Sequence, residues 1–119
     1  MKLLIVQTAA MLAGAPVPAS SAPALTELND ARSAFGQCMQ HQIVKANPTA
    51  APEAIAGTAF AACQPQQARL RLALAATQSG SAERQAEALR KFDEGIAASR
   101  VQVADYIRTF RKGAAAHGN

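Results

Sequence analysis

The sequence of 119 residues has no tryptophan, one tyrosine and four phenylalanines. Proteins that stack sugars or nucleobases present several aromatic rings on one surface, so this composition argues against both kinds of ligand. The formal net charge is only +4, and acidic residues are mixed with basic ones along the chain. Because a nucleic-acid-binding protein gathers positive charge on one face, we expect no nucleic-acid partner.

Motifs that carry enzymatic chemistry are also missing. The sequence has no G-x-S-x-G, no glycine-rich phosphate loop and no H-E-x-x-H. Asp93 and Glu94 are adjacent carboxylates, but neighbouring residues of a helix point about 100° apart. Their proximity to Arg90 and Lys91 favours a solvated, ion-paired face over a catalytic couple. We therefore expect a protein with no enzymatic activity and no cofactor.

The N-terminus has the pattern of an export signal. Lys2 supplies a positive charge, residues 3–13 form a short apolar stretch, and a segment of small residues and prolines follows. The apolar stretch is shorter than the roughly 20 residues that cross a bilayer core. Residues 1–24 are thus predicted to be a signal peptide, cleaved after Ala19 or Ala24, with an uncleaved anchor as the alternative. The mature protein is expected to be periplasmic or secreted, and not transmembrane after signal removal.

The rest of the sequence lacks the apolar–polar alternation of β-strands. Apolar residues recur instead at spacings of three and four, which predicts helices at about 25–46, 52–77 and 82–112. Prolines separate the first two helices, and Ser81 is placed to cap the third. Short connections make consecutive helices antiparallel, so we predict an all-α, up-down-up three-helix antiparallel bundle. Residues 113–119 are predicted to form a disordered tail.

Two further expectations concern the longer helices. Pro65 lies inside the second one, where it removes a backbone donor; this predicts a kink, with a break as the alternative. The third helix has a clear apolar stripe. The residues expected on its buried face are Leu89, Phe92, Ile96, Val103, Ile107 and Phe110.

The two cysteines are predicted to form a disulfide. Cys38 lies 8 residues before the end of the first predicted helix, and Cys63 lies 11 residues after the start of the second. These offsets place them about 12 Å and 16 Å from the intervening turn, on apolar stripes that face each other. An exported chain with two such cysteines is expected to bridge them, joining the first helix to the second. Phe35 and Phe60 should then lie near the bridge, and His41 should be exposed.

A metal site is the alternative role for these cysteines. Cys38, His41 and Cys63 are the candidate ligands, and the neighbouring Met39 would suit copper. A closed zinc site needs four ligands, however, and no further histidine or cysteine is near. Covalent haem attachment needs C-x-x-C-H, which is absent, and His117 lies in the predicted tail. The disulfide is the preferred interpretation.

Basic residues gather near the second predicted turn. They could form a basic strip suited to an acidic protein partner or an anionic envelope surface, or extend individually over an alanine-rich surface. The residues of this predicted basic strip are Arg69, Arg71, Arg84, Arg90 and Lys91.

These observations predict a small exported helical protein. Its expected role is that of a non-enzymatic binding or structural module of the bacterial envelope, with a protein or an anionic envelope surface as its partner. The alternatives are a periplasmic metal- or haem-carrying protein and a holdase-like periplasmic chaperone.

Overall fold

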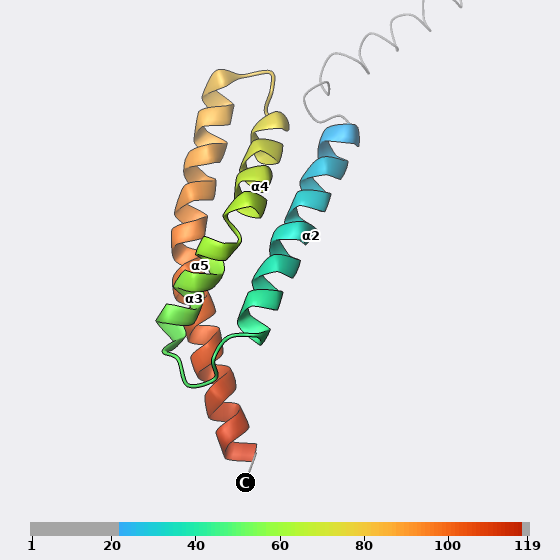
Figure 1. Ribbon diagram of the computed structural model, residues 1–119. Helices are drawn as coiled ribbons and strands as arrows, with labels where there is room; N and C mark the ends of the chain where they lie inside the picture. Colours follow the sequence, from blue (N-terminus) through green and yellow to red (C-terminus); the bar gives the residue numbers. More distant parts are fainter. Residues whose placement is uncertain (1–21, 118–119) are drawn as a thin grey trace, which may run out of the picture.

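The structure, a computed structural model, describes residues 22–117, which form four α-helices and contain no strand. The helices are α2 (Ala22–Val44), α3 (Pro52–Ala62), α4 (Gln64–Ala76) and α5 (Ala82–His117). In Figure 1, α2 and α5 run downward while α3 and α4 run upward. The predicted all-α class is confirmed. The signal-peptide prediction falls mainly outside the described residues: Ala19 is not among them, and Ala24 lies in the first turn of α2.

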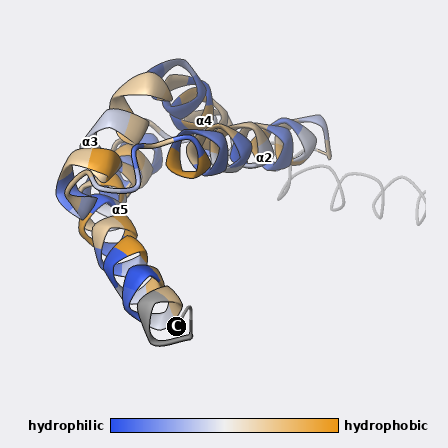
Figure 2. Ribbon diagram, turned by 60° about the horizontal axis from the view of Figure 1, so that its bottom comes forward, coloured by the Kyte–Doolittle hydropathy of each residue, from blue (hydrophilic) through white to orange (hydrophobic). Residues whose placement is uncertain are grey.

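The helices pack in two halves. α2 lies mainly against α4, and α3 lies mainly against α5. Figure 2 shows the C-terminal part of α5 extending away from the α2–α4 half. One core cluster, at the α2–α4 contact, is built on Leu28, Ala31 and Ala73. The other, where α2, α3 and α5 meet, is built on Met39, Ala59, Phe60 and Cys63.

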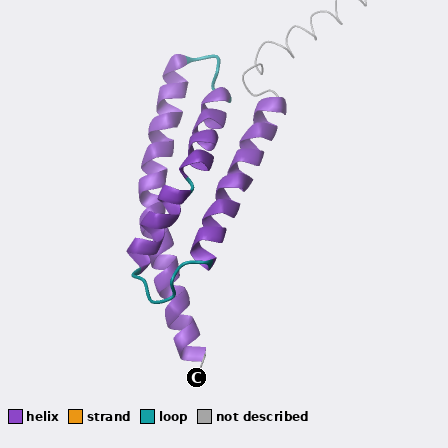
Figure 3. Cartoon of the chain, viewed as in Figure 1, coloured by secondary structure: helices purple, strands orange, loops and turns teal. Residues whose placement is uncertain are grey.

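The second predicted helix is divided into two, which corrects both the three-helix count and the kink. Cys63, with φ −100° and ψ 19°, separates α3 from α4, and Figure 3 shows the short non-helical segment there. Pro65 therefore lies in the first turn of α4. A helix needs no intrahelical partner for the N–H groups of its first turn, so proline is favourable at this position.

The remaining helix ends differ from the predictions by a few residues. α5 continues to His117, through part of the segment that was predicted to be a disordered tail. Residues 114–116 are alanines, which have the highest helix propensity, and this explains the longer helix. At the other end of α5 the cap is as predicted: the Ser81 hydroxyl oxygen accepts a hydrogen bond from the Arg84 backbone N–H, with a donor–acceptor distance of 3.2 Å.

The disulfide between Cys38 and Cys63 is present, with a Cα–Cα distance of 5.9 Å. It joins α2 to the junction of α3 and α4. The Phe35 and Phe60 rings meet edge to face in the same cluster, with centroids 6.0 Å apart, and His41 is exposed. All three sequence predictions about this region are confirmed.

Removing the bridge is expected to destabilise the fold. Cys38→Ser should lower the free energy of unfolding by about 2–5 kcal/mol, because the unfolded chain regains the entropy of a long loop. The measurement is urea unfolding followed by circular dichroism, with reduction of the unmodified protein as a second way to open the bridge. A reductant should have no further effect on the variant. Equal stability of the oxidised and reduced proteins would contradict the expectation.

Candidate functional site

An apolar groove lies between the C-terminal parts of α2 and α5, with a volume of about 770 Å³. We call it the C-terminal groove. Its lining residues are Gly36, Met39, Gln40, Ile43, Val44, Ala46, Pro48, Ile55, Tyr106, Ile107, Phe110 and Arg111. It exists because α2 packs on α4 while α5 packs on α3, so the ends of α2 and α5 do not close on each other.

The floor and the rim of the groove differ in burial. Met39, Ile55 and Ile107 are buried, whereas Tyr106 and Phe110 are 64% and 65% exposed. The two aromatic rings stack one helical turn apart on α5, with centroids 6.4 Å apart. Single exposed apolar side chains are ordinary, but several around one apolar groove indicate an interaction surface.

The exposure of Phe110 corrects the sequence prediction, which placed it on the buried face of the third helix. Ile107, one turn earlier, is buried as expected. The difference arises because α5 has 36 residues and α2 has 23, so α5 is roughly 20 Å longer. Figure 1 shows its C-terminal end extending past the loop between α2 and α3. The third predicted helix, 82–112, is longer than the first, 25–46. This difference in length was the signal in the sequence that could have revealed the groove.

The charge around the groove is positive. Its lining contains Arg111 and no aspartate or glutamate. Arg111 donates a hydrogen bond to the Ala50 carbonyl oxygen at 2.7 Å, which holds the loop against α5 but leaves the cation without a carboxylate. Lys45 and Lys112, next to lining residues on α2 and α5, form no ion pair with any residue in 22–117. Three cations are therefore uncompensated at this end of the molecule.

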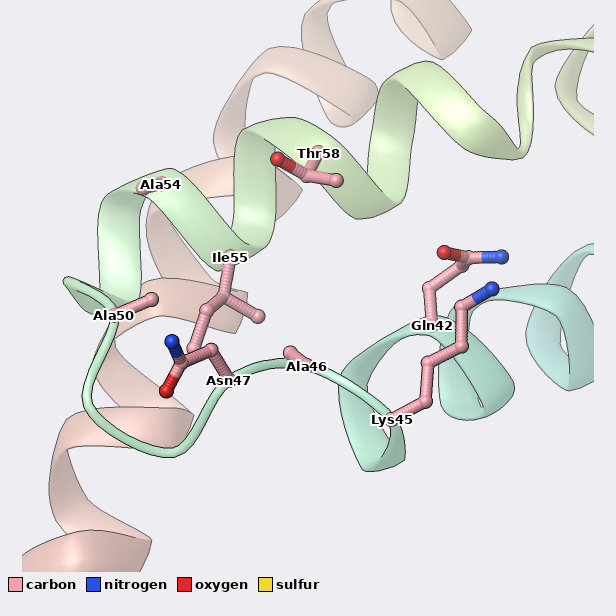
Figure 4. A pocket seen from close by; sticks show the side chains of 8 residues that line it. All are labelled: Gln42, Lys45, Ala46, Asn47, Ala50, Ala54, Ile55 and Thr58. Carbon is pink, nitrogen blue, oxygen red and sulfur yellow. The ribbon is translucent and has the colours of Figure 1, made fainter.

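A smaller hollow of about 340 Å³ adjoins the groove and shares Ala46 and Ile55 with it. Figure 4 shows Ile55 pointing from α3 toward the loop, while Gln42 and Lys45 project from the end of α2. The remaining residues that line it are Asn47, Ala50, Ala54 and Thr58. The Asn47 side-chain oxygen accepts hydrogen bonds from the backbone N–H and the hydroxyl of Thr49 at 2.9 Å and 2.8 Å, which fixes the shape of the loop.

Three of the five residues of the predicted basic strip form ion pairs. Arg69 on α4 binds Glu27 of α2 at 2.9 Å, and Arg71 on α4 binds Asp93 of α5 at 3.0 Å. Arg90 pairs with two glutamates of its own helix, Glu87 and Glu94. The structure brings Arg84 and Lys91 together around a shallow hollow near the start of α5. The five residues thus do not present one continuous surface of free positive charge.

The ion pairs between helices lower the pKa of their carboxyl groups. The hydrogen bond from Arg69 is the main cause for Glu27, and the hydrogen bond from Arg71 is the main cause for Asp93. For Glu53 of α3 a backbone hydrogen bond contributes most to the lower pKa, followed by the hydrogen bond from Arg108 of α5. These groups are at the surface, so each pair contributes little to stability at neutral pH.

The cysteines of the alternative metal set are bonded to each other, which leaves His41 as its only free member. In residues 22–117, no three histidine, cysteine, aspartate or glutamate side chains are grouped so that they could hold a metal ion. Within the same range, none of the helices combines the length and the apolarity needed to cross a bilayer.

Acid should weaken the links between helices. A carboxyl group whose pKa is lower in the folded state stabilises the fold above its ordinary pKa, here 4.5 for glutamate. That contribution is lost as the pH falls through the folded pKa. Replacing Glu27 by Gln should therefore reduce the loss of stability between pH 7 and pH 3, measured by urea unfolding. Glu83→Gln is the control, since Glu83 forms no ion pair. An equal pH dependence in both variants would contradict the expectation.

Comparison with known proteins assigns no function to this chain. No protein-family model matches the chain, and no curated protein and no solved structure is significantly similar to it.

Proposed function

We propose that this protein is a non-enzymatic module of the bacterial envelope that binds another protein in its C-terminal groove. The observation that carries the proposal is the apolar groove with the exposed Val44, Tyr106 and Phe110 at its rim. Large aromatic side chains are typical anchors of protein interfaces, because they bury much surface and lose little side-chain entropy.

The chemistry of the lining supports binding over catalysis. The groove residues include no serine, cysteine, histidine, aspartate or glutamate, and the one hydroxyl, that of Tyr106, has no base beside it in the lining to activate it. Most of the lining is apolar, with Gln40, Tyr106 and Arg111 as the polar side chains, and the groove is open rather than a closed pocket for a small molecule. An extended apolar surface of this kind suits a protein partner.

The envelope as the location rests on the sequence and on the disulfide. Residues 1–24 have the charge, apolar stretch and small residues of a signal peptide. A structural disulfide forms and persists in an oxidising compartment such as the periplasm. Both features support export, and an exported groove would be available to envelope or periplasmic partners.

The proposed export and signal-peptide cleavage can be tested by intact-mass spectrometry. Protein purified from the periplasmic fraction of an expressing bacterium should have lost its signal peptide, so that the mature chain begins at Ser20 or Leu25. Intact-mass spectrometry distinguishes the two sites and also detects the two-proton loss caused by the disulfide. A full-length mass in the envelope fraction would contradict the expectation and indicate an anchored protein.

The binding surface can be tested by photo-crosslinking in cells. A benzophenone amino acid placed at Val44 or Phe110 should crosslink to the same partner, because both residues lie at the rim of the groove. Leu72 on α4 and Val101 on α5 are matched controls, since both are exposed apolar residues outside the groove. Crosslinking at the control positions should be absent. Equal crosslinking from all four positions, or none from the two groove positions, would overturn the proposal.

A further inference from the structure

The walls of the C-terminal groove are two helices. On α2 the lining includes Gly36, Gln40 and Ile43, and on α5 it includes Tyr106 and Phe110. These residues follow one another at the three- and four-residue spacing of a helical ridge. A third helix that lies between these two ridges can pack its own side chains, which also recur every three or four residues, into the space between them. The form of the groove therefore matches a helix better than an extended peptide.

Gly36 lies on the α2 wall of this groove, in the middle of the helix. A Cβ atom at this position would have no neighbour within 4 Å, and the backbone φ is not positive. The fold of the chain itself thus does not require glycine here, although glycine weakens a helix relative to alanine. Its missing side chain leaves room for the backbone of a partner helix to approach α2 closely.

The charge near the groove indicates the polar face of that helix. Lys45, Arg111 and Lys112 have no carboxylate partners, as described above. Six of the chain's eight acidic residues are already used in ion pairs. The remaining two, Asp30 and Glu83, lie near the starts of α2 and α5, at the opposite end of the bundle. Negative charge to match the groove must therefore come from the partner.

The same charges argue against a second copy of the chain as the occupant. A two-fold symmetric contact through the groove would place its cations against their own counterparts. An anionic bilayer surface could take up the exposed Tyr106 and Phe110 at the rim. It is less suited to the groove as a whole, because a flat surface does not reach the buried floor residues Met39 and Ile107, whereas the side chains of an inserted helix can.

We infer that the C-terminal groove receives an amphipathic α-helix of the partner, with an apolar stripe against Tyr106 and Phe110 and with aspartate or glutamate flanking that stripe. This inference rests on the proposed function, since it specifies the partner that the groove binds. The binding mode is that of a helix in a groove, and the lysines and arginine around the rim select its charge.

The test uses a pair of designed peptides and the full mature protein. Each peptide has about 18 residues and forms an amphipathic helix with one leucine stripe; one carries glutamate and the other lysine on the flanking positions. Neither contains tyrosine or tryptophan. Tyr106 is the only tyrosine of the protein, which has no tryptophan, so its fluorescence reports directly on the groove.

The glutamate peptide should change Tyr106 emission saturably and bind about tenfold more tightly than the lysine peptide at low salt. The difference should shrink as salt screens the charges. Phe110→Ala should weaken the glutamate peptide about tenfold or more by removing an anchor. Gly36→Ala should weaken it severalfold, while Gly95→Ala should not. Gly95 is likewise a helical glycine whose added Cβ meets nothing within 4 Å, but it lies outside the groove.

Gly36→Ala and Gly95→Ala should both raise helix stability. If only Gly36→Ala binds the peptide more weakly, the loss of affinity therefore cannot be caused by unfolding. Equal affinity for the two peptides, or an unchanged affinity in Phe110→Ala, would overturn the inference. So would a Tyr106 response to phosphatidylglycerol vesicles but not to the peptides, or self-association that Phe110→Ala abolishes. If crosslinking at Val44 and Phe110 to another protein persists in these cases, the proposed function stands and only the acidic helix is wrong.

Discussion

The bond between Cys38 and Cys63 holds together a molecule that has little core of its own. Phe60 and Cys63 are the largest fully buried side chains. In the part of the chain that the structure describes, half of the other ten buried residues are alanines, so little apolar volume is buried in the core. Cys63 is also the residue at which α3 ends and α4 begins. The bond therefore fixes α2 to the junction of the two halves of the bundle. Small domains with thin cores commonly depend on such a covalent link.

This arrangement explains why an apolar groove remains open. The bridge and its surrounding cluster hold α2 against α3, while α5 packs along α3 and extends beyond it. Within residues 22–117, no helix consequently covers Tyr106 and Phe110 of α5 on the side that faces the end of α2. Tyr106 and Phe110 stay exposed, even though Phe110 continues the apolar stripe of the helix. Apolar surface that folding leaves uncovered is available for association, and this is the physical basis of the proposed function.

The distribution of charge follows from the same packing. The carboxylates Glu27, Glu53 and Asp93 each accept hydrogen bonds from an arginine of another helix, so three of the eight acidic residues link helices at the surface. Lys45, Arg111 and Lys112 near the groove have no such partners among the described residues. Unpaired positive charge therefore lies at the end of the bundle where the apolar surface is open, as well as at Arg84 and Lys91 near the start of α5, whereas the two arginines of α4 are paired. A partner recognised there would combine apolar contact with negative charge.

The sequence alone determined the features that depend on local spacing. Helical periodicity located the helices to within a few residues, and the positions of Cys38 and Cys63 relative to the turn predicted the bridge and the nearby Phe35 and Phe60. Tertiary structure decided whether Pro65 would kink or break its helix, and which apolar residues would be covered. Phe110 belongs to the apolar stripe as much as Ile107 does, but Ile107 is buried and Phe110, near the end of the longer α5, is exposed. Periodicity identifies the apolar face of a helix, whereas burial depends on how far the neighbouring helices extend along it.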